Sequence, residues 1–329
     1  MAGAPCGIEW FKNAKFGLFL HYGLYSLIGR GEWVQYVENI PLAEYAKLMR
    51  DFTAKDFDAD FITDLALDAE MKYVNLTSMH HDGFCLFESK VTDYTSVNSA
   101  ARRDLVGELA EQCHKKGLGL CLYYSHGRQW KHPHAMSPPK YDESSRPKYP
   151  VPEPAYATGR AHDISKYVEY CEAQITELLT NYGTVANIWF DGWYTPMSGP
   201  WEEELRIPQL YAAIKRLQPD CLISYKWGLT GTEDFYAPEF GWPDEDEVQM
   251  AKARANPKPM ELCHPITCWA YRAEERGKHR DPDSVMADFE HVAKYNANYL
   301  LGTGPEPTGI IDKQDAATLR EVGKRLRAG

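Results

Sequence analysis

Five apolar, strand-like runs in this 329-residue chain end in side chains that could do chemistry. In a barrel of parallel strands the carboxyl ends of the strands meet at one mouth, and barrel enzymes build their sites there. The pattern therefore predicts a single site supplied with histidines, tyrosines, a carboxylate and a lysine. The five polar ends are His21, His80-His81-Asp82-Gly83, Tyr123-Tyr124-Ser125-His126, Asp191-Gly192 and Lys226-Trp227.

Asp191 has the most distinctive surroundings of these residues. It follows the apolar run 185–190, which ends in Trp189 and Phe190, and Gly192 comes next. A carboxylate in such an apolar setting is poorly solvated, so Asp191 could serve as a nucleophile, a general base or a metal ligand. The structural alternative is an aspartate that caps a turn or a helix after a strand.

Two other acids, Glu239 and Glu32, are further candidates. Glu239 ends the segment Ala237-Pro238-Glu239 in an acid-rich loop, and Glu32 directly precedes Trp33. An acid beside an aromatic ring suits a sugar, because the carboxylate accepts hydrogen bonds from hydroxyls while the ring covers an apolar face. Solvated loop acids are the alternative for both residues.

The eleven histidines raise the alternative of a metal-dependent hydrolase. Adjacent His80 and His81 point to opposite sides of a strand, however, and the sequence has no His-Glu-x-x-His pattern. We therefore expect no metal and no cofactor. The histidines are better used as hydrogen-bond partners of a polyhydroxylated ligand.

Aromatic residues make up 13% of the chain, and together with histidines and separated carboxylates they suit a monosaccharide ligand. Glycoside hydrolysis needs two carboxyl groups around the scissile bond. They lie about 5–5.5 Å apart in retaining enzymes and about 6.5–9.5 Å apart in inverting ones. The sequence leaves this distance open.

The elements that must position these residues alternate between apolar strands and amphipathic helices. This alternation indicates a parallel sheet covered on both faces, and no G-x-G-x-x-G pattern follows the first strand. We predict an α/β fold, a (β/α)8 TIM-like barrel with one short or irregular strand. Strands are predicted over residues 16–23, 73–79, 118–125, 185–190, 221–227, 261–269 and 299–302, with a short eighth at 235–237, and helices over 42–52, 105–116, 163–182, 201–217, 284–295 and 314–326.

Composition sets the wider expectations. No linker divides the chain, which predicts a single barrel domain over residues 1–329. A net charge of −11 argues against a nucleic-acid partner, and no apolar run reaches the 18 or so residues of a membrane span. The N-terminus lacks the pattern of a signal peptide, so we expect a cytoplasmic protein, or a secreted or periplasmic one if a leader was removed.

Several motifs in one order, over residues 8–326, resemble the α-L-fucosidases of glycoside hydrolase family 29. Two of them contain the candidate acids: Trp189-Phe190-Asp191-Gly192 resembles the nucleophile motif, and Asp234-Phe235-Tyr236-Ala237-Pro238-Glu239 resembles the acid/base loop. The other matching segments are residues 10–26, 73–94, 103–109, 122–125 and 296–305.

The resemblance implies a retaining, exo-acting α-L-fucosidase that uses no cofactor and acts on fucosylated oligosaccharides or glycoconjugates. It implies that Asp191 forms a fucosyl ester and that Glu239 acts as acid and then as base. By the same matching, the sugar hydroxyls would be bound by His21, Glu32, Trp33, His80, His81 and Tyr124, and the C5 methyl group would be enclosed by Phe19, Trp189 and Trp269.

Two departures from the family pattern bear on specificity. Ser224-Tyr225-Lys226-Trp227 stands where the family often has Asn-Asp-Arg-Trp, and a lysine at the sugar cannot copy the fork of an arginine. The chain also ends where many members continue into a β-sandwich, so we expect none here and keep open a homo-oligomer that completes the site. The alternatives are a related glycosidase with another sugar specificity and a catalytically silent fucose- or glycan-binding barrel.

Overall fold

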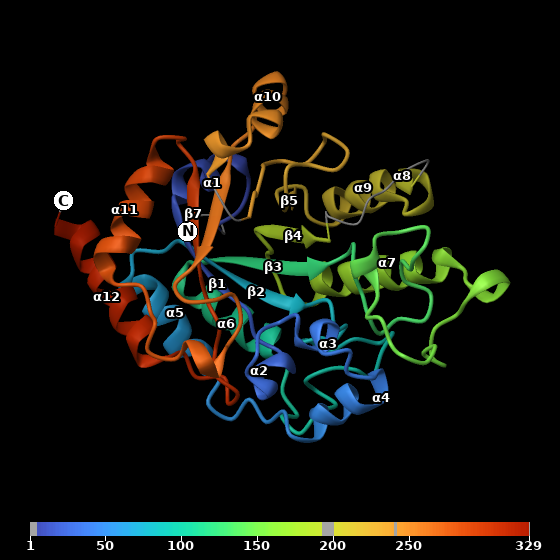
Figure 1. The fold of residues 1–329 in the computed structure, drawn as a ribbon. Helices are drawn as coiled ribbons and strands as arrows, with labels where there is room; N and C mark the ends of the chain where they lie inside the picture. The colour runs from blue at the N-terminus through green and yellow to red at the C-terminus, as the bar shows by residue number, and fades with distance from the viewer. Residues whose placement is uncertain (1–4, 193–200, 240–241, 329) are drawn as a thin grey trace.

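The computed structural model describes residues 5–192, 201–239 and 242–328, and these residues form seven parallel strands in one curled sheet (Figure 1). The strand order is β5-β4-β3-β2-β1-β7-β6. In this order β1 to β5 lie side by side and β7 returns to pair with β1, as the strands of a (β/α)8 TIM-like barrel do. The fold prediction is confirmed. The strands are β1 (Phe16–Leu20), β2 (Tyr73–Met79), β3 (Gly119–Ser125), β4 (Asn187–Asp191), β5 (Leu222–Tyr225), β6 (Glu261–Pro265) and β7 (Asn298–Thr303).

An irregular segment, residues 235–239, occupies the position between β5 and β6. Phe235 forms a parallel bridge with Ser224 of β5, while Tyr236 and Glu239 form parallel bridges with Met260 and Cys263. The predicted eighth strand at 235–237 is therefore in the expected place but is not a regular strand. Pro238 has no N–H group to donate, which accounts for the interrupted pairing.

The helices cover the outside of the sheet, and several begin and end at residues that the sequence marks. Residues 105–116 are helical as predicted, with the side chain of Asp104 accepting a hydrogen bond from the N–H of Gly107 and with Gly117 in the left-handed conformation at the end. The helices are α1 (Ile8–Ala14), α2 (Tyr25–Ile28), α3 (Val34–Val37), α4 (Leu42–Tyr45), α5 (Ala59–Asp68), α6 (Leu105–Lys116), α7 (Ile164–Asn181), α8 (Trp201–Glu204), α9 (Ile207–Leu217), α10 (Glu247–Ala255), α11 (Pro282–Ala293) and α12 (Lys313–Ala328).

Other predicted boundaries were wrong. The predicted helix 42–52 is a single turn, α4, followed by the 3-10 helix Ala46–Arg50, and the predicted helix 201–217 is split at Arg206, where φ is 51°. Strands β1 and β6 are shorter than the runs that predicted them, because the chain turns into mouth loops after Leu20 and Pro265. The sequence analysis missed α1, α2, α3, α5 and α10.

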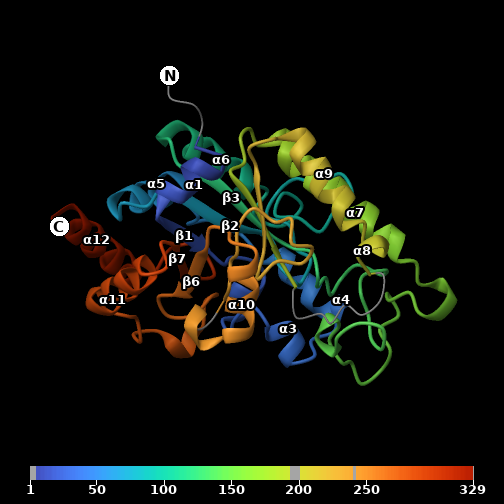
Figure 2. The ribbon, with the colours of Figure 1, turned by 90° about the horizontal axis from the view of Figure 1, so that it is seen from above.

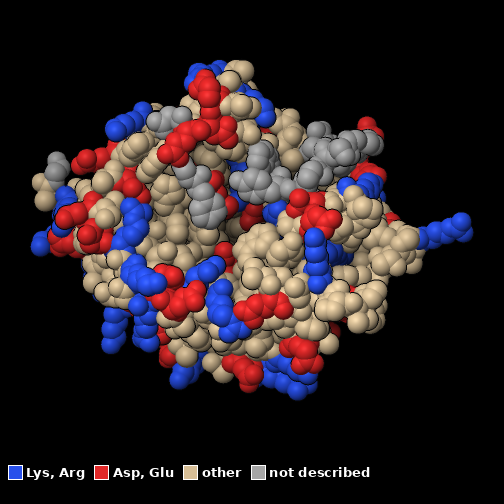
Figure 3. Space-filling view, in the orientation of Figure 1, with Lys and Arg blue, Asp and Glu red and all other residues tan. Residues whose placement is uncertain are grey.

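Seen from above, α5, α11 and α12 lie on one side of the strands and α7 and α9 on the other (Figure 2). In the described part of the chain, no helix is both long and apolar enough to cross a membrane. On the face drawn in Figure 3, acidic and basic side chains are interspersed around a hollow near the middle.

Strand residues alternate between two buried layers. Leu18, Leu122 and Ile188 belong to the layer under the helices, whereas Tyr123 and Trp189 belong to a separate cluster inside the barrel. Helix α1 contributes to this inner cluster as well. This alternation decides which side chains at the strand ends reach the mouth.

The interior also contains a buried carboxyl group, Glu261, at the start of β6. Its two oxygens accept hydrogen bonds from the hydroxyl of Tyr73 at 2.6 Å and from Nε1 of Trp189 at 3.0 Å. Burial raises the pKa of Glu261 from 4.5 to about 7, although both hydrogen bonds oppose the shift. The interior therefore favours the neutral carboxyl group.

We expect the wild-type fold to lose stability as pH rises because of Glu261, and we expect Glu261→Gln to abolish this loss. Between pH 4.5 and about 7 the folded protein holds a proton on Glu261 that the unfolded chain releases, so this group destabilises the wild-type fold increasingly as pH rises. The stability of the variant relative to wild type should therefore rise by up to about 3 kcal/mol from pH 4.5 to pH 8. Urea unfolding at the two pH values measures it, with exposed Glu111→Gln as control. A stability difference that does not change with pH would contradict the assignment.

Candidate active site

Asp191, the last residue of β4, lies in a network of donors at the barrel mouth. Its Oδ2 accepts a hydrogen bond of 2.5 Å from the hydroxyl of Tyr123, and its Oδ1 lies 3.0 Å from Nζ of Lys226. Burial acts to raise the pKa of Asp191, yet the Lys226 ammonium, with smaller help from the Tyr123 hydroxyl and the Arg128 guanidinium, holds it well below its usual range. Asp191 is therefore an ionised carboxylate.

The backbone around Asp191 explains the glycine that follows it. The carbonyl oxygen of Asp191 accepts hydrogen bonds from the N–H groups of His126 at 3.1 Å and Gly127 at 2.8 Å. Gly192 has a φ of 106°, and a Cβ there would lie 2.3 Å from the Cα of Gly127. The two strand ends can approach this closely only because both residues are glycines.

Glu239 reaches the same mouth from the irregular segment between β5 and β6. Its bridge to Cys263 fixes the backbone, and its Oε1 lies 2.5 Å from Nζ of Lys226. Burial raises the pKa of Glu239, and the neighbouring Asp191 carboxylate adds to that shift while Lys226 opposes it. The two acids thus differ in electrostatic environment, which is the arrangement that separates a nucleophile from a proton donor.

The contacts to Lys226 limit how far apart the two acids lie. Because Nζ is 3.0 Å from Oδ1 of Asp191 and 2.5 Å from Oε1 of Glu239, these two oxygens are separated by no more than the total of 5.5 Å. Both acids also line one cavity of about 120 Å³.

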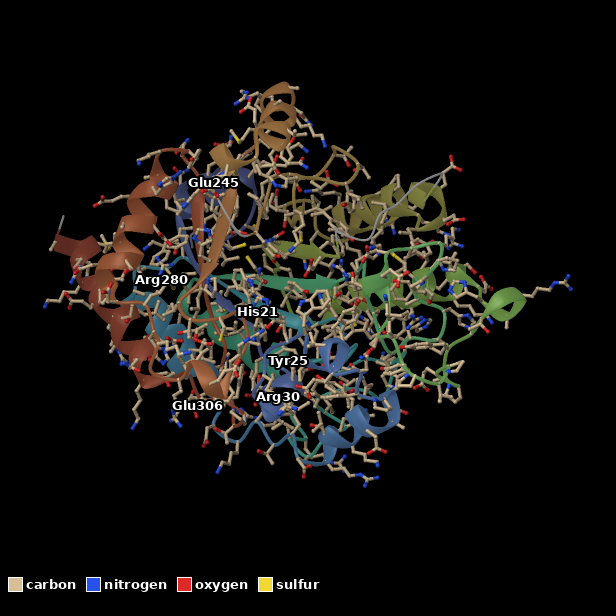
Figure 4. All side chains as sticks on the ribbon, viewed as in Figure 1. His21, Tyr25, Arg30, Glu245, Arg280 and Glu306 are labelled. Carbon is tan, nitrogen blue, oxygen red and sulfur yellow. The ribbon has the colours of Figure 1, made fainter. Side chains whose placement is uncertain are left out.

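Three histidines at the ends of β1 and β2 surround this cavity as neutral rings. Burial lowers the pKa of His81 to about 3 and holds the pKa values of His21 and His80 well below the usual range. Ser125 donates its hydroxyl proton to the carbonyl of Arg128, so His81 must donate from Nδ1 to Ser125 and keeps Nε2 unprotonated. That Nε2 lies 3.8 Å from Asp191. His21 occupies the middle of the ribbon in Figure 4.

Two paired mouth loops supply the remaining lining. His21 bridges to Ala270, and Arg30 bridges to Arg272, which brings Glu32 and Trp33 to the cavity together with Trp269. Burial raises the pKa of Glu32. The guanidinium of Arg128 lies 5.3 Å from the centre of the Trp33 ring and also lines the cavity.

The structure brings most of the predicted residues together. The cavity lining includes His21, Glu32, Trp33, His80, His81, Asp191, Glu239 and Trp269. Phe19 and Trp189 lie beneath it, fully buried against one another with ring centres 5.4 Å apart, and Lys226 lies 4.4 Å above the Trp189 ring. These two aromatic rings therefore form the floor beneath the lining rather than the cavity surface.

The placement of Tyr124 as a site residue was wrong. Its side chain faces the helices, where its hydroxyl donates to Gln174 of α7 at 2.8 Å. Neighbouring Tyr123 faces the interior instead, because adjacent strand residues point to opposite faces. The sequence analysis missed Tyr123 and Arg128. Strand alternation gave a signal for Tyr123, because residues two positions apart in a strand share a face and Tyr123 lies two positions from both Cys121 and Ser125. No feature of the sequence places Arg128 at the mouth.

The expectation that His80 and His81 point to opposite sides of a strand was wrong, because both follow the end of β2 and both line the cavity. With Asp191 they bring potential metal-ligand atoms within 4.8 Å of one another. A cation there would compete with the Lys226 ammonium, which already lies 3.0 Å from Asp191, and would approach the positive charge of Arg128. Like-charge repulsion therefore disfavours this set as a metal site.

The loop after β3 is held from within by a buried arginine, Arg146. Its guanidinium donates hydrogen bonds of 2.7–3.3 Å to backbone carbonyl oxygens and lies 4.0 Å from the ring centre of Tyr156. The carbonyl oxygens belong to Gln129, Trp130, His132, Pro133 and Ala135. Arg146 thereby fixes the segment next to Arg128 and under the Trp33 ring, which packs on Trp130.

Comparison with protein families matches residues 6–328 to the alpha-L-fucosidase family. Tissue alpha-L-fucosidase of Rattus norvegicus is 27% identical over 97% of this chain and 68% of its own length, and that of Homo sapiens is 26% identical over 96% and 67%. The chain spans 64% of the length of a Caenorhabditis elegans relative.

Solved structures give the same family. Alpha-L-fucosidase isoenzyme 1 from Paenibacillus thiaminolyticus superposes with a TM-score of 0.86 and 35% identity, over 98% of this chain and 75% of that one. Alpha-L-fucosidase AlfC from Lactobacillus casei, in complex with its alpha-L-fucose product, superposes with a TM-score of 0.81 and 29% identity, over 97% and 98%.

We expect Arg146→Met to loosen the loop after β3. Several buried carbonyl oxygens would lose their donor, each at a cost of about 1–3 kcal/mol, so unfolding free energy should fall by at least about 3 kcal/mol. Urea unfolding and the rate of thermolysin cleavage within residues 126–160 measure the effect. Exposed Arg160→Met is the control and should change neither. Equal behaviour of the two variants would show that Arg146 does not hold the loop.

Proposed function

Because the chain belongs to the alpha-L-fucosidase family, we propose that it is a retaining, exo-acting α-L-fucosidase. In this proposal the enzyme removes terminal α-L-fucosyl groups from oligosaccharides or glycoconjugates by double displacement. Asp191 and Glu239 are the two carboxyl groups of the reaction, and the intermediate is a fucosyl ester of Asp191.

The observation that carries the proposal is the separation of the two acids. The contacts to Lys226 limit the oxygens of Asp191 and Glu239 to a separation of 5.5 Å at most. Retaining glycosidases place their two carboxyl groups about 5–5.5 Å apart, whereas inverting ones need about 6.5–9.5 Å to admit a water molecule. The limit applies to the two oxygens that contact Lys226, and oxygens no farther apart than this support direct attack by one carboxylate.

The electrostatics support distinct roles for the two acids. Asp191 is ionised beside Lys226 and so can attack the anomeric carbon. Burial raises the pKa of Glu239, a shift toward the protonated form that a donor to the departing oxygen needs. In the second half of the reaction, the same residue takes a proton from the water that attacks the ester, as microscopic reversibility requires.

The cavity supports binding of one sugar ring. Its volume of about 120 Å³ is well below the 300–1,000 Å³ or so of sites for drug-sized ligands, which favours an exo-acting enzyme. His21 and His80 are neutral rings that line the cavity, so they offer hydrogen-bonding partners to a hydroxylated ligand. Trp269, 7% exposed, offers an apolar wall for the methyl group of a 6-deoxy sugar.

The central test is Asp191→Gly, measured with 4-nitrophenyl α-L-fucopyranoside. We expect kcat to fall at least about 1,000-fold, a loss of about 4 kcal/mol in transition-state stabilisation. The variant should still fold, because Glu239 remains as a counter-ion for Lys226. Azide should partly restore turnover by attacking the vacated face. Near-normal activity of the variant would refute the assigned nucleophile, and a wild-type protein that binds fucose without turnover would indicate a silent binding barrel.

Tyr123→Phe and Tyr124→Phe form a matched pair on adjacent residues. Tyr123→Phe removes a donor to the ionised Asp191, worth about 1.5–3 kcal/mol, so kcat/KM should fall about 10- to 150-fold. Tyr124→Phe removes hydrogen bonds to Gln174 and Cys171 of α7, outside the barrel, and should leave kcat/KM within about twofold, as expected of a substitution distant from the site. Equal losses in the two variants would contradict the inward orientation of Tyr123.

A further inference from the structure

Lys226 is a buried lysine whose amine contacts both acids of the proposed reaction. Its side chain is 3% exposed, and its Nζ lies 3.0 Å from Asp191 and 2.5 Å from Glu239. The face of the Trp189 ring lies 4.4 Å below Nζ. A charged amine at this depth requires an opposite charge beside it.

The backbone of Lys226 is held in a conformation that favours glycine. Lys226 follows β5 with a φ of 50°, in the left-handed region, and its carbonyl oxygen accepts a hydrogen bond of 2.8 Å from Ala237. That bond joins Lys226 to the segment that carries Glu239. A lysine held in this unfavourable region at a site indicates that its position matters there.

The single positive charge of Lys226 can balance the negative charge of one of the two neighbouring acids. Burial would lower the pKa of Lys226, but Asp191 and Glu239 raise it, so the amine stays charged. In the proposed reaction Asp191 supplies the balancing anion in the free enzyme, and Glu239 carries the proton that it donates, in keeping with the lowered pKa of Asp191 and the raised pKa of Glu239. The three groups together are then neutral.

The proposed reaction moves the negative charge from one acid to the other. When an Asp191 oxygen bonds to the anomeric carbon, the bond to the leaving oxygen breaks and that oxygen takes the proton of Glu239. Asp191 is then a neutral ester and Glu239 is the anion. When water attacks, its proton goes to Glu239, the ester bond breaks and Asp191 regains its charge.

We propose that Lys226 is a catalytic residue that pairs with whichever acid is ionised, Asp191 in the free enzyme and Glu239 in the fucosyl-enzyme ester. This inference rests on the proposed function and deepens it. Lys226 keeps Glu239 ionised in the ester, so that Glu239 can act as the base. Without the ammonium, the buried Glu239 of the ester would take up a proton from solvent, and hydrolysis of the ester would stall for lack of a base.

The other charged and titratable groups around these three residues do not replace Lys226. His21, His80 and His81 are neutral because burial lowers their pKa values, while the pKa values of Tyr123 and Cys263 are raised by burial. Glu32 adds negative rather than positive charge. Arg128 contributes positive charge to Asp191, but less than Lys226 does.

The test compares Lys226→Met with Lys226→Arg, using 4-nitrophenyl α-L-fucopyranoside. In Lys226→Met the acidic limb of kcat/KM should move to higher pH, because Asp191 loses its main counter-ion. Above that limb kcat should fall about 100-fold or more, the contribution of a general base. The ester should accumulate, seen as a burst of nitrophenol and as an adduct in intact-protein mass spectra. Azide needs no base and should restore turnover, and Lys226→Arg should recover most of the loss.

Lys215→Met is the matched control, because Lys215 pairs with Asp234 outside the cavity, and it should show none of these effects. If Lys226→Met does not fold, Lys226→Gln carries the same test. The inference alone would be overturned if Lys226→Met kept the pH dependence and kcat of wild type. It would also be overturned if kcat fell without accumulation of the ester or rescue by azide. A wild-type protein that releases no nitrophenol would instead overturn the proposed function.

Discussion

A single buried ammonium between two buried carboxyl groups is the constraint on which the site depends. Neither charge type is stable in the apolar mouth of the barrel without the other. Lys226 lies 3.0 Å from Asp191 and 2.5 Å from Glu239, and its ammonium lowers the pKa of Asp191. The two carboxylate oxygens that contact this amine are therefore no more than 5.5 Å apart.

The barrel supplies these three residues from neighbouring positions. Asp191 ends β4 and Lys226 follows β5, which pairs with β4 in parallel register. Glu239 comes from the next position, where Pro238 interrupts regular pairing and lets the chain leave the sheet at the mouth. The irregular position of the barrel is thus also the one that supplies the second acid.

The surroundings favour a small, hydroxylated ligand over an ion. Burial keeps the histidines neutral, so they offer hydrogen-bond donors and acceptors without charge. The mouth loops add acids and aromatic side chains, and Arg146 orders the longest of the connections from within. Such a site would discriminate against ligands whose missing hydroxyls leave its buried polar groups unpaired.

The sequence by itself determined the α/β alternation, the order of the strands and the residue types at their ends, because buried parallel strands and capped helices have local signals. Asp191, Glu239 and the histidines followed from these signals together with the family resemblance. Which of Tyr123 and Tyr124 faces inward depends on the register of the sheet, and a resemblance placed the wrong one in the site. Only the tertiary structure decided that Lys226 contacts both acids, because the distances depend on how the ends of β4 and β5 and the irregular segment 235–239 pack at the mouth.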